Sequence, residues 1–123
     1  MTSSTRKVDD ITVVDISGRV TLAEGTSGTL RDLIRKLVSK GTKRIVLNLA
    51  GVTFVDSAGM GELVRALTSL RNEGGDLKLL NVPKRVRDLL QITKLHTVFD
   101  LKEDESAAVR AFTGQIPPTI PSL

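Results

Sequence analysis

The 123-residue chain contains no cysteine, no tryptophan and no tyrosine, and aromatic residues make up only 2% of it. The absence of cysteine excludes disulfides and thiolate metal sites. Because aromatic residues are so few, the core must be built from the aliphatic residues that supply most of the 40% hydrophobic content. No apolar run approaches the ~20 residues that span a bilayer, and the N-terminus has no apolar signal-peptide core. We expect a soluble, cytoplasmic protein without membrane insertion.

A strong excess of one charge is also missing, because 18 basic and 14 acidic residues leave a net charge of only +4. The densest cationic group, KRVRDLLQITK at 84–94, surrounds an apolar helical stripe, which is typical of a solvated helix face. Stacking on single-stranded nucleic acid needs aromatic rings, and this segment has none. We therefore expect no direct binding to nucleic acid.

Apolar, β-branched runs alternate with segments of helical periodicity, which predicts an α/β fold with parallel strands and a mixed sheet. Strands are expected within residues 9–18, 43–51, 77–82 and 96–101, preceded by a short strand at 6–8 and a turn at Asp9-Asp10. Residues 18–28 are expected to form a loop. Helices are expected over residues 26–39, from Ser57 to Gly74-Gly75, after Pro83 through Ile92, and after a capping Asp104 through Phe112. Residues 1–113 are predicted to form a single domain, and 114–123 a flexible Pro-rich tail.

The segment TFVDSAGMGELV at 53–64 places a carboxylate, a serine and two glycines where a strand gives way to a helix. A hydrolase nucleophile elbow needs glycine two residues before its serine, where this chain has Val55. The single histidine, His96, comes late among apolar neighbours and is a poor candidate for a catalytic base. A dinucleotide-binding loop needs a third glycine where Val64 stands. These departures disfavour a catalytic serine and a nucleotide cofactor.

An aspartyl phosphate on Asp56 would need an acidic pair after the first long strand to hold a metal ion, but Asp9-Asp10 precedes that strand. We therefore expect no metal site. Two interpretations of the motif remain open on spacing alone. Asp56 or Ser57 caps the helix, or Ser57 accepts a phosphate at the positive end of the helix dipole. Gly59 and Gly61 each cost roughly 1 kcal/mol against alanine in a helix, unless a partner or the neighbouring loop approaches closely there.

The segment IVLNLAGVTFVDSAGMGELV at 45–64 resembles the signature of STAS domains in bacterial anti-sigma factor antagonists. The resemblance extends over nearly the whole chain, from TVVDISGRV to VRDLLQITKLHTVFDL. It implies a STAS fold with a mixed four- to five-stranded sheet and about four helices, largely packed on one side. It also implies a non-enzymatic regulator without cofactors.

In this family the motif serine is phosphorylated by an anti-sigma factor that is also a GHKL-type serine kinase, and a PP2C-type phosphatase reverses the reaction. The unphosphorylated antagonist binds the kinase and frees the sigma factor. By this resemblance Ser57 is the phosphoacceptor. The residues expected to face the kinase are Asp56, Ala58, Gly59 and Met60 of the motif, and Thr21, Ala23 and Glu24 of the preceding loop. The sequence leaves a weak homodimer open.

One departure lies at Gly18-Arg19-Val20-Thr21, where many relatives carry acidic residues, and Glu24 is a candidate for the missing charge. Thr53 is a second candidate phosphosite, although a strand-edge threonine explains it as well. An alternative function is a constitutive STAS subunit of a lipid-transport ABC system or a stress-signalling complex, without a phosphorylation switch.

Overall fold

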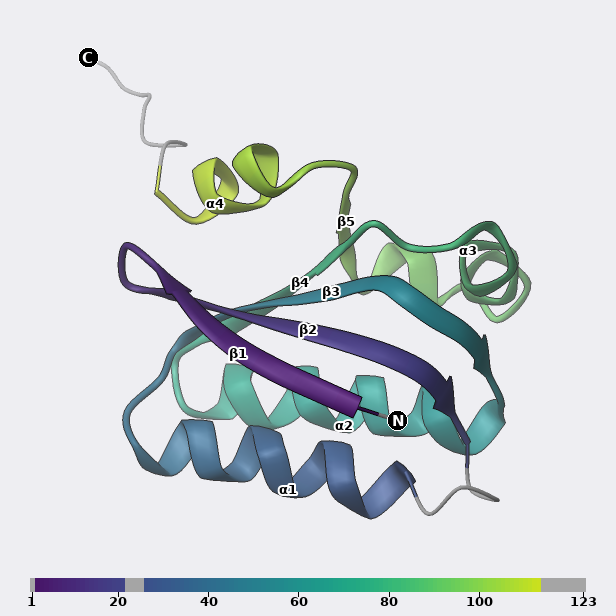
Figure 1. Cartoon of the computed structure of the whole chain (residues 1–123), viewed down its shortest axis with the longest axis horizontal. Coiled ribbons are helices and arrows are strands. Elements are labelled where there is room, and N and C mark those ends of the chain that lie inside the picture. Colours follow the sequence, from purple (N-terminus) through teal and green to yellow (C-terminus); the bar gives the residue numbers. More distant parts are fainter. Residues whose placement is uncertain (1, 22–25, 114–123) are drawn as a thin grey trace.

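The computed structural model describes residues 2–21 and 26–113, which form one five-stranded sheet with four α-helices and a 3-10 turn (Figure 1). The strands are β1 (Thr2–Val8), β2 (Ile11–Val20), β3 (Arg44–Val55), β4 (Asp76–Leu80) and β5 (Asp100–Lys102). The helices are α1 (Thr26–Ser39), α2 (Ser57–Asn72), α3 (Lys84–Ile92), the 3-10 turn η1 (Leu95–Thr97) and α4 (Glu105–Thr113). The predicted mixed α/β architecture is confirmed.

The strands lie in the sheet in chain order, with β1 antiparallel to β2 and every later pair parallel. Crossovers between parallel strands are almost always right-handed, so successive crossovers in one direction put their helices on one face. Accordingly, α1 and α2 lie side by side under the sheet, and α4 alone covers part of the opposite face (Figure 1). α3 lies near the carboxyl end of β3. This end of the sheet is where α2 begins.

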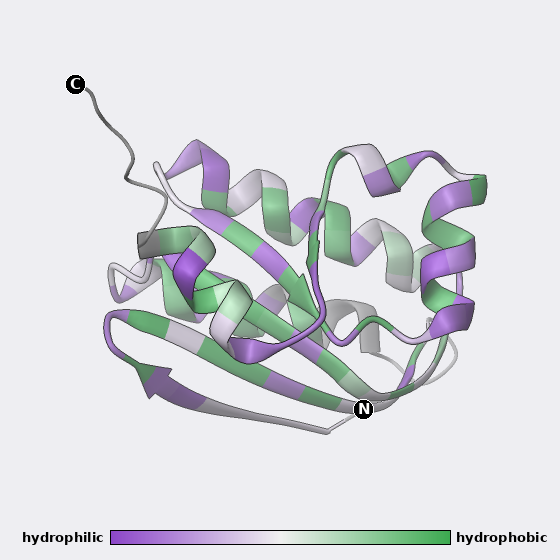
Figure 2. Ribbon diagram, turned by 90° about the horizontal axis from the view of Figure 1, so that it is seen from above, coloured by the Kyte–Doolittle hydropathy of each residue, from purple (hydrophilic) through white to green (hydrophobic). Residues whose placement is uncertain are grey.

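Two apolar clusters fill the space on the two faces of the sheet. The larger lies under α1, α2 and α3 and includes Val14, Leu47 and Leu67. The smaller lies under α4 and includes Val13 and Val46. Successive strand residues point to opposite faces, so neighbours such as Val13 and Val14 enter different clusters. The central strands are therefore apolar along most of their length (Figure 2), as predicted for a strand covered on both faces.

Polar contacts hold α4 on the second face. Arg6 Nε lies 2.9 Å from Asp15 Oδ2, and the Arg6 guanidinium also donates to Glu105 of α4. These hydrogen bonds hold the pKa of both carboxyls below the usual values. Buried Lys78 places its Nζ 4.7 Å from the centre of the Phe112 ring. Helix α4 is thus docked by cation contacts as well as by apolar burial.

The predicted loop at residues 18–28 is wrong at its start, because β2 continues to Val20, whereas the predicted helix over residues 26–39 is confirmed by α1. The pairing of β2 with β3 shifts register twice, between Asp15 and Ser17 and between Gly18 and Arg19. Gly18 adopts a φ of 91°, which a side chain would disfavour. The bulges let β2 follow the long strand β3 as far as the Val20–Val55 pair.

The predicted strand at 96–101 is also largely wrong. Lys94 adopts a left-handed φ of 63°, and the chain then makes the η1 turn, so pairing with β4 starts only at Asp100. The turn brings Phe99 into the larger cluster, where it is buried. The predicted cap of α4 is confirmed, since Asp104 Oδ1 accepts the Ala107 N–H at 2.8 Å. The tail prediction for 114–123 lies outside the described residues.

None of the helices within residues 2–21 and 26–113 is both long enough and apolar enough to span a bilayer.

Candidate functional site

The site begins where β3 ends, at the entrance to α2. Asp56 has an extended backbone (φ −94°, ψ −176°) and is the N-cap of the helix. Its Oδ1 accepts the Gly59 N–H at 2.8 Å, and its carbonyl accepts the Met60 N–H at 2.9 Å. The side-chain bond satisfies a donor that the first helical turn would otherwise leave unpaired, and the carbonyl bond is the first regular hydrogen bond of the helix. Of the two predicted capping residues, Asp56 is the one that caps the helix.

Gly59 is required by the contact between α2 and β2. A Cβ built on Gly59 would lie 2.1 Å from the carbonyl oxygen of Val20, far inside any contact distance. The same oxygen accepts the Asp56 N–H at 3.3 Å. The atoms nearest to a Cβ on Gly61 would be those of the Arg65 guanidinium, at 3.3 Å. The close approach that explains Gly59 is therefore made by the protein's own strand.

Ser57 is the first residue of α2, and its side chain is exposed. The first turn of a 16-residue helix presents N–H groups and the positive end of the helix dipole to solvent. Ala58 beside it is half-buried. Thr53, the second candidate phosphosite, is also exposed, on β3. The hydroxyl of Ser57 is therefore accessible to another protein at a position that tolerates negative charge.

The other residues predicted to face a kinase are placed differently. Met60 and Thr21 are only 4% and 2% exposed, and Gly59 is buried. These three residues contribute to the packing beneath the site and offer little side-chain surface to a partner. Ala23 and Glu24 lie outside the described residues. Partner binding by this set stays a prediction.

The residues weighed for other chemistries lie apart from Ser57. Asp9-Asp10 forms the turn before β2, at the opposite end of the sheet, and Asp10 Oδ2 pairs with Arg44 at 3.1 Å. His96 lies on η1, with its Nδ1 3.4 Å from the Leu90 carbonyl oxygen. Within the part of the chain that the structure describes, no three histidine or acidic side chains gather to hold a metal ion.

The sequence prediction missed a groove of about 440 Å³ that opens beside Ser57 between β3 and α3. We call it the Ser57 groove. Its lining residues are Phe54, Val55, Asp56, Ser57, Arg85, Val86, Asp88, Leu89 and Ile92. The sequence feature that pointed to this groove is the apolar spacing of α3. Leu90 is the last buried residue of the helix, and the apolar spacing continues beyond it to Ile92. Sequence alone does not say which of these apolar residues the sheet leaves uncovered.

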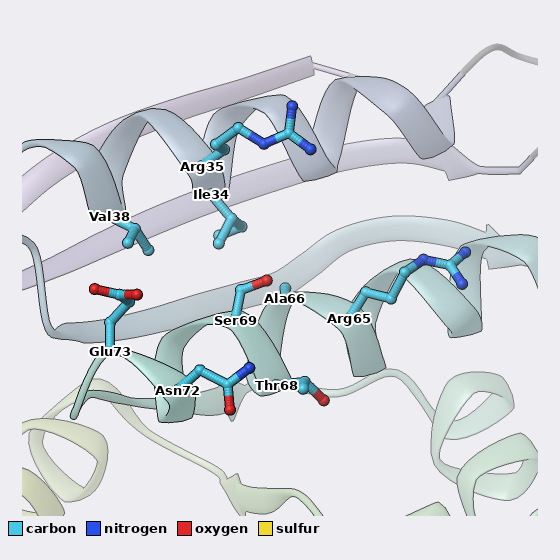
Figure 3. Close-up of a pocket in the computed structure, with 9 residues that line it drawn as sticks. All are labelled: Ile34, Arg35, Val38, Arg65, Ala66, Thr68, Ser69, Asn72 and Glu73. Carbon is cyan, nitrogen blue, oxygen red and sulfur yellow. The ribbon is translucent and has the colours of Figure 1, made fainter.

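A second cavity, of about 390 Å³, lies between α1 and α2 (Figure 3). Ile34, Val38 and Ala66 form its apolar floor, and its remaining lining residues are polar or charged. Arg65, at its edge, pairs with the buried carboxylate of Glu62 at 2.6 Å. This cavity shares no lining residue with the Ser57 groove.

The family assignment follows from comparison with known proteins. A family model described as STAS domain matches residues 2–108. The chain belongs to the STAS domain family. This STAS domain is 27% identical over 111 residues to BtrV of Bordetella bronchiseptica, whose name describes it provisionally as an anti-sigma factor antagonist, covering 90% of this chain and 94% of BtrV. It is 30% identical over 95 residues to the anti-sigma-B factor antagonist of Staphylococcus epidermidis, covering 77% of this chain and 86% of that protein.

The STAS fold is also shared with the anti-sigma factor antagonist SpoIIAA of Bacillus, which has been solved in two forms. The unphosphorylated form has a TM-score of 0.70 at 20% identity and covers 91% of this chain and 99% of SpoIIAA. The phosphorylated form has a TM-score of 0.69 at 21% identity and covers 89% of this chain and 99% of SpoIIAA. The predicted membership of the STAS family and the predicted fold are confirmed.

Proposed function

We propose that this STAS domain is an anti-sigma factor antagonist switched by phosphorylation of Ser57. The observation that carries the proposal is the geometry of the α2 entrance, where an exposed serine occupies the first helical position behind the Asp56 cap. BtrV and the staphylococcal relative bear the name of this function. SpoIIAA, which shares the fold, exists in phosphorylated and unphosphorylated forms.

Electrostatics explains how such a switch acts without unfolding the domain. A phosphate adds about −1.5 to −2 charges at pH 7 and three acceptor oxygens. At the start of α2 the helix dipole and free N–H groups stabilise this charge, while the neighbouring Asp56 carboxylate repels it. The two effects oppose each other within the domain. A partner surface docked over Ser57 has no group that offsets the added charge and no room for the phosphate. The partner therefore no longer binds.

The proposed partners are those that the family resemblance implies. An anti-sigma factor with GHKL-type serine kinase activity binds the unphosphorylated form and transfers the phosphoryl group to the Ser57 hydroxyl. A PP2C-type phosphatase regenerates the binding form. The antagonist supplies no catalytic group in this scheme. It controls sigma-factor-dependent transcription by holding or releasing the kinase.

Incubation with ATP and the purified anti-sigma serine kinase of the same organism tests the proposal. We expect the mass of one phosphate, assigned to Ser57 by fragmentation and stable to hydroxylamine, and no phosphate on Ser57→Ala. Thr53→Ala is the matched control and is expected to be phosphorylated like the unmodified protein. Ser57→Asp and Ser57→Glu are expected to lose binding to the kinase.

Three results would contradict the proposal. Equal kinase binding by the unmodified protein and both acidic variants would show that negative charge at Ser57 does not control binding. Loss of the phosphate in hydroxylamine would indicate an acyl phosphate, as expected of Asp56. Stable co-purification with an ATPase, unaffected by substitution of Ser57, would favour the constitutive-subunit alternative.

A further inference from the structure

The Ser57 groove is lined in part by exposed apolar side chains. Within the described residues three large hydrophobic side chains are exposed, and two of them, Phe54 and Ile92, line this groove. Ile92 is 79% exposed. Single exposed apolar residues are common on soluble proteins, but a contiguous patch beside a functional residue is typical of an interaction site.

The local structure explains why these side chains face outward. On β3 the side chain of Val55 enters the core, so that of Phe54, one position earlier, points to the other side of the strand. On α3, Val86 and Leu90 anchor the helix in the larger apolar cluster, and Leu89 packs at its edge. Ile92 follows Leu89 at helical spacing and extends this apolar stripe beyond the core.

Cationic groups border the apolar walls. Arg85 lines the groove from α3, and the Arg19 guanidinium lies 5.0 Å from the centre of the Phe54 ring. The groove's Asp88 carboxylate pairs with Lys84 at 2.9 Å, and the other carboxylate, that of Asp56, holds the helix cap. The acidic side chains are therefore engaged within the domain. This arrangement is complementary to an apolar side chain with a carboxylate beside it.

We infer that the Ser57 groove is the docking site for an apolar side chain, flanked by an acidic residue, of the serine kinase that phosphorylates Ser57. This inference rests on the proposed function. The groove is continuous with Ser57, so a kinase whose active site reaches the hydroxyl covers the groove as well. Its volume of about 440 Å³ lies within the ~300–1,000 Å³ of typical ligand pockets, enough to enclose a large side chain. Apolar anchors of this kind usually dominate the affinity of an interface.

The variant Ile92→Asp tests the inference, with Gln91→Asp as the matched control. Gln91 is exposed on the same helix and does not line the groove, so both variants add one negative charge at neighbouring positions. The measurements are the dissociation constant for the purified kinase, the rate of Ser57 phosphorylation and the urea midpoint of unfolding. We expect Ile92→Asp to weaken binding at least about tenfold and to slow phosphorylation, with the same urea midpoint as Gln91→Asp, because both variants place a negative charge in the last turn of α3. Gln91→Asp is expected to bind the kinase and to accept phosphate like the unmodified protein.

A second variant, Arg85→Glu, tests the charged border of the groove. It is expected to weaken kinase binding several-fold at low salt, with a smaller loss at high salt, because an exposed charge is screened. It also provides a test if Ile92→Asp shifts the unfolding midpoint.

The outcomes separate this inference from the proposed function. If the unmodified protein is phosphorylated on Ser57 while Ile92→Asp and Arg85→Glu bind the kinase as tightly as Gln91→Asp, the inference is overturned and the function stands. If the unmodified protein neither binds the kinase nor accepts phosphate, both fail. Self-association that Ile92→Asp abolishes, with kinase binding unchanged, would assign the groove to a second copy of this chain and overturn the inference.

Discussion

At each end of α2 a glycine packs against a backbone carbonyl oxygen, Gly59 against that of Val20 and Gly75 against that of Lys43. A Cβ would lie 2.1 Å from the Val20 oxygen if built on Gly59, and 2.2 Å from the Lys43 oxygen if built on Gly75. The same two oxygens accept backbone N–H groups, from Asp56 at 3.3 Å and from Asp76 at 2.8 Å. The helix is thus attached to the sheet by the same arrangement at both ends.

The two ends differ in what they expose. The first turn presents the Ser57 hydroxyl beside an apolar groove. The other end presents charged side chains that contact one another or the backbone, such as Arg71 with Asp76 at 3.2 Å and Lys43 with the Glu73 carbonyl. The glycine found at each end of α2 is therefore explained by the packing of the helix against the sheet. The serine and its apolar surroundings distinguish the end of the helix at which we propose the function.

Substitution of the packed glycines is expected to have the largest effect on stability. Gly59→Ala and Gly75→Ala each force a backbone shift, because the obstructing atom is a carbonyl oxygen and not a flexible side chain. We expect each to lower the free energy of unfolding by about 1–3 kcal/mol or more, measured by urea denaturation.

Gly61→Ala is the control within the same helix turn. Its Cβ meets only the end of Arg65, so the gain in helix propensity is expected to stabilise the protein by about 0.5–1 kcal/mol. If Gly59→Ala changed the free energy of unfolding as Gly61→Ala does, the close packing of Gly59 against the Val20 carbonyl oxygen would not be a constraint on this residue.

Removal of the cap acts at one end only. Asp56→Ala deletes the acceptor for the Gly59 N–H and is expected to lower the free energy of unfolding by about 1 kcal/mol. Asp56→Asn keeps a side-chain oxygen at this position and is expected to retain most of that stability. Equal losses in both variants, measured by thermal or urea unfolding, would show that the capping bond is not the cause.

A negative charge is expected to have small effects that differ between the two ends. Ser57→Asp places it at the positive end of the α2 dipole, beside Asp56, so the free energy of unfolding is expected to change by less than about 0.5 kcal/mol. Asn72→Asp places it at the negative end, where a loss of about 0.3–1 kcal/mol is expected. Both are measured at low and high salt. A larger loss for Ser57→Asp than for Asn72→Asp would contradict the dipole argument.

Much of this organisation was predictable from sequence because local patterns determine it. The apolar periodicity after Ser57 predicted α2, and the Asp-Ser pair predicted its cap. The run of β2 through Gly18 was not predictable, because bulged pairing with β3 overrides the loop-like composition of that segment. The close approach of Val20 to Gly59 and the uncovered Ile92 were also missed, since both depend on how distant segments pack.

The most direct test of the central claim compares the unphosphorylated protein with the protein phosphorylated on Ser57. The dissociation constant for the kinase and the free energy of unfolding are measured on the same two samples. The account predicts that phosphorylation weakens binding at least about tenfold while the free energy of unfolding changes by less than about 1 kcal/mol. Unchanged binding, or a loss of binding that accompanies unfolding of the domain, would contradict it.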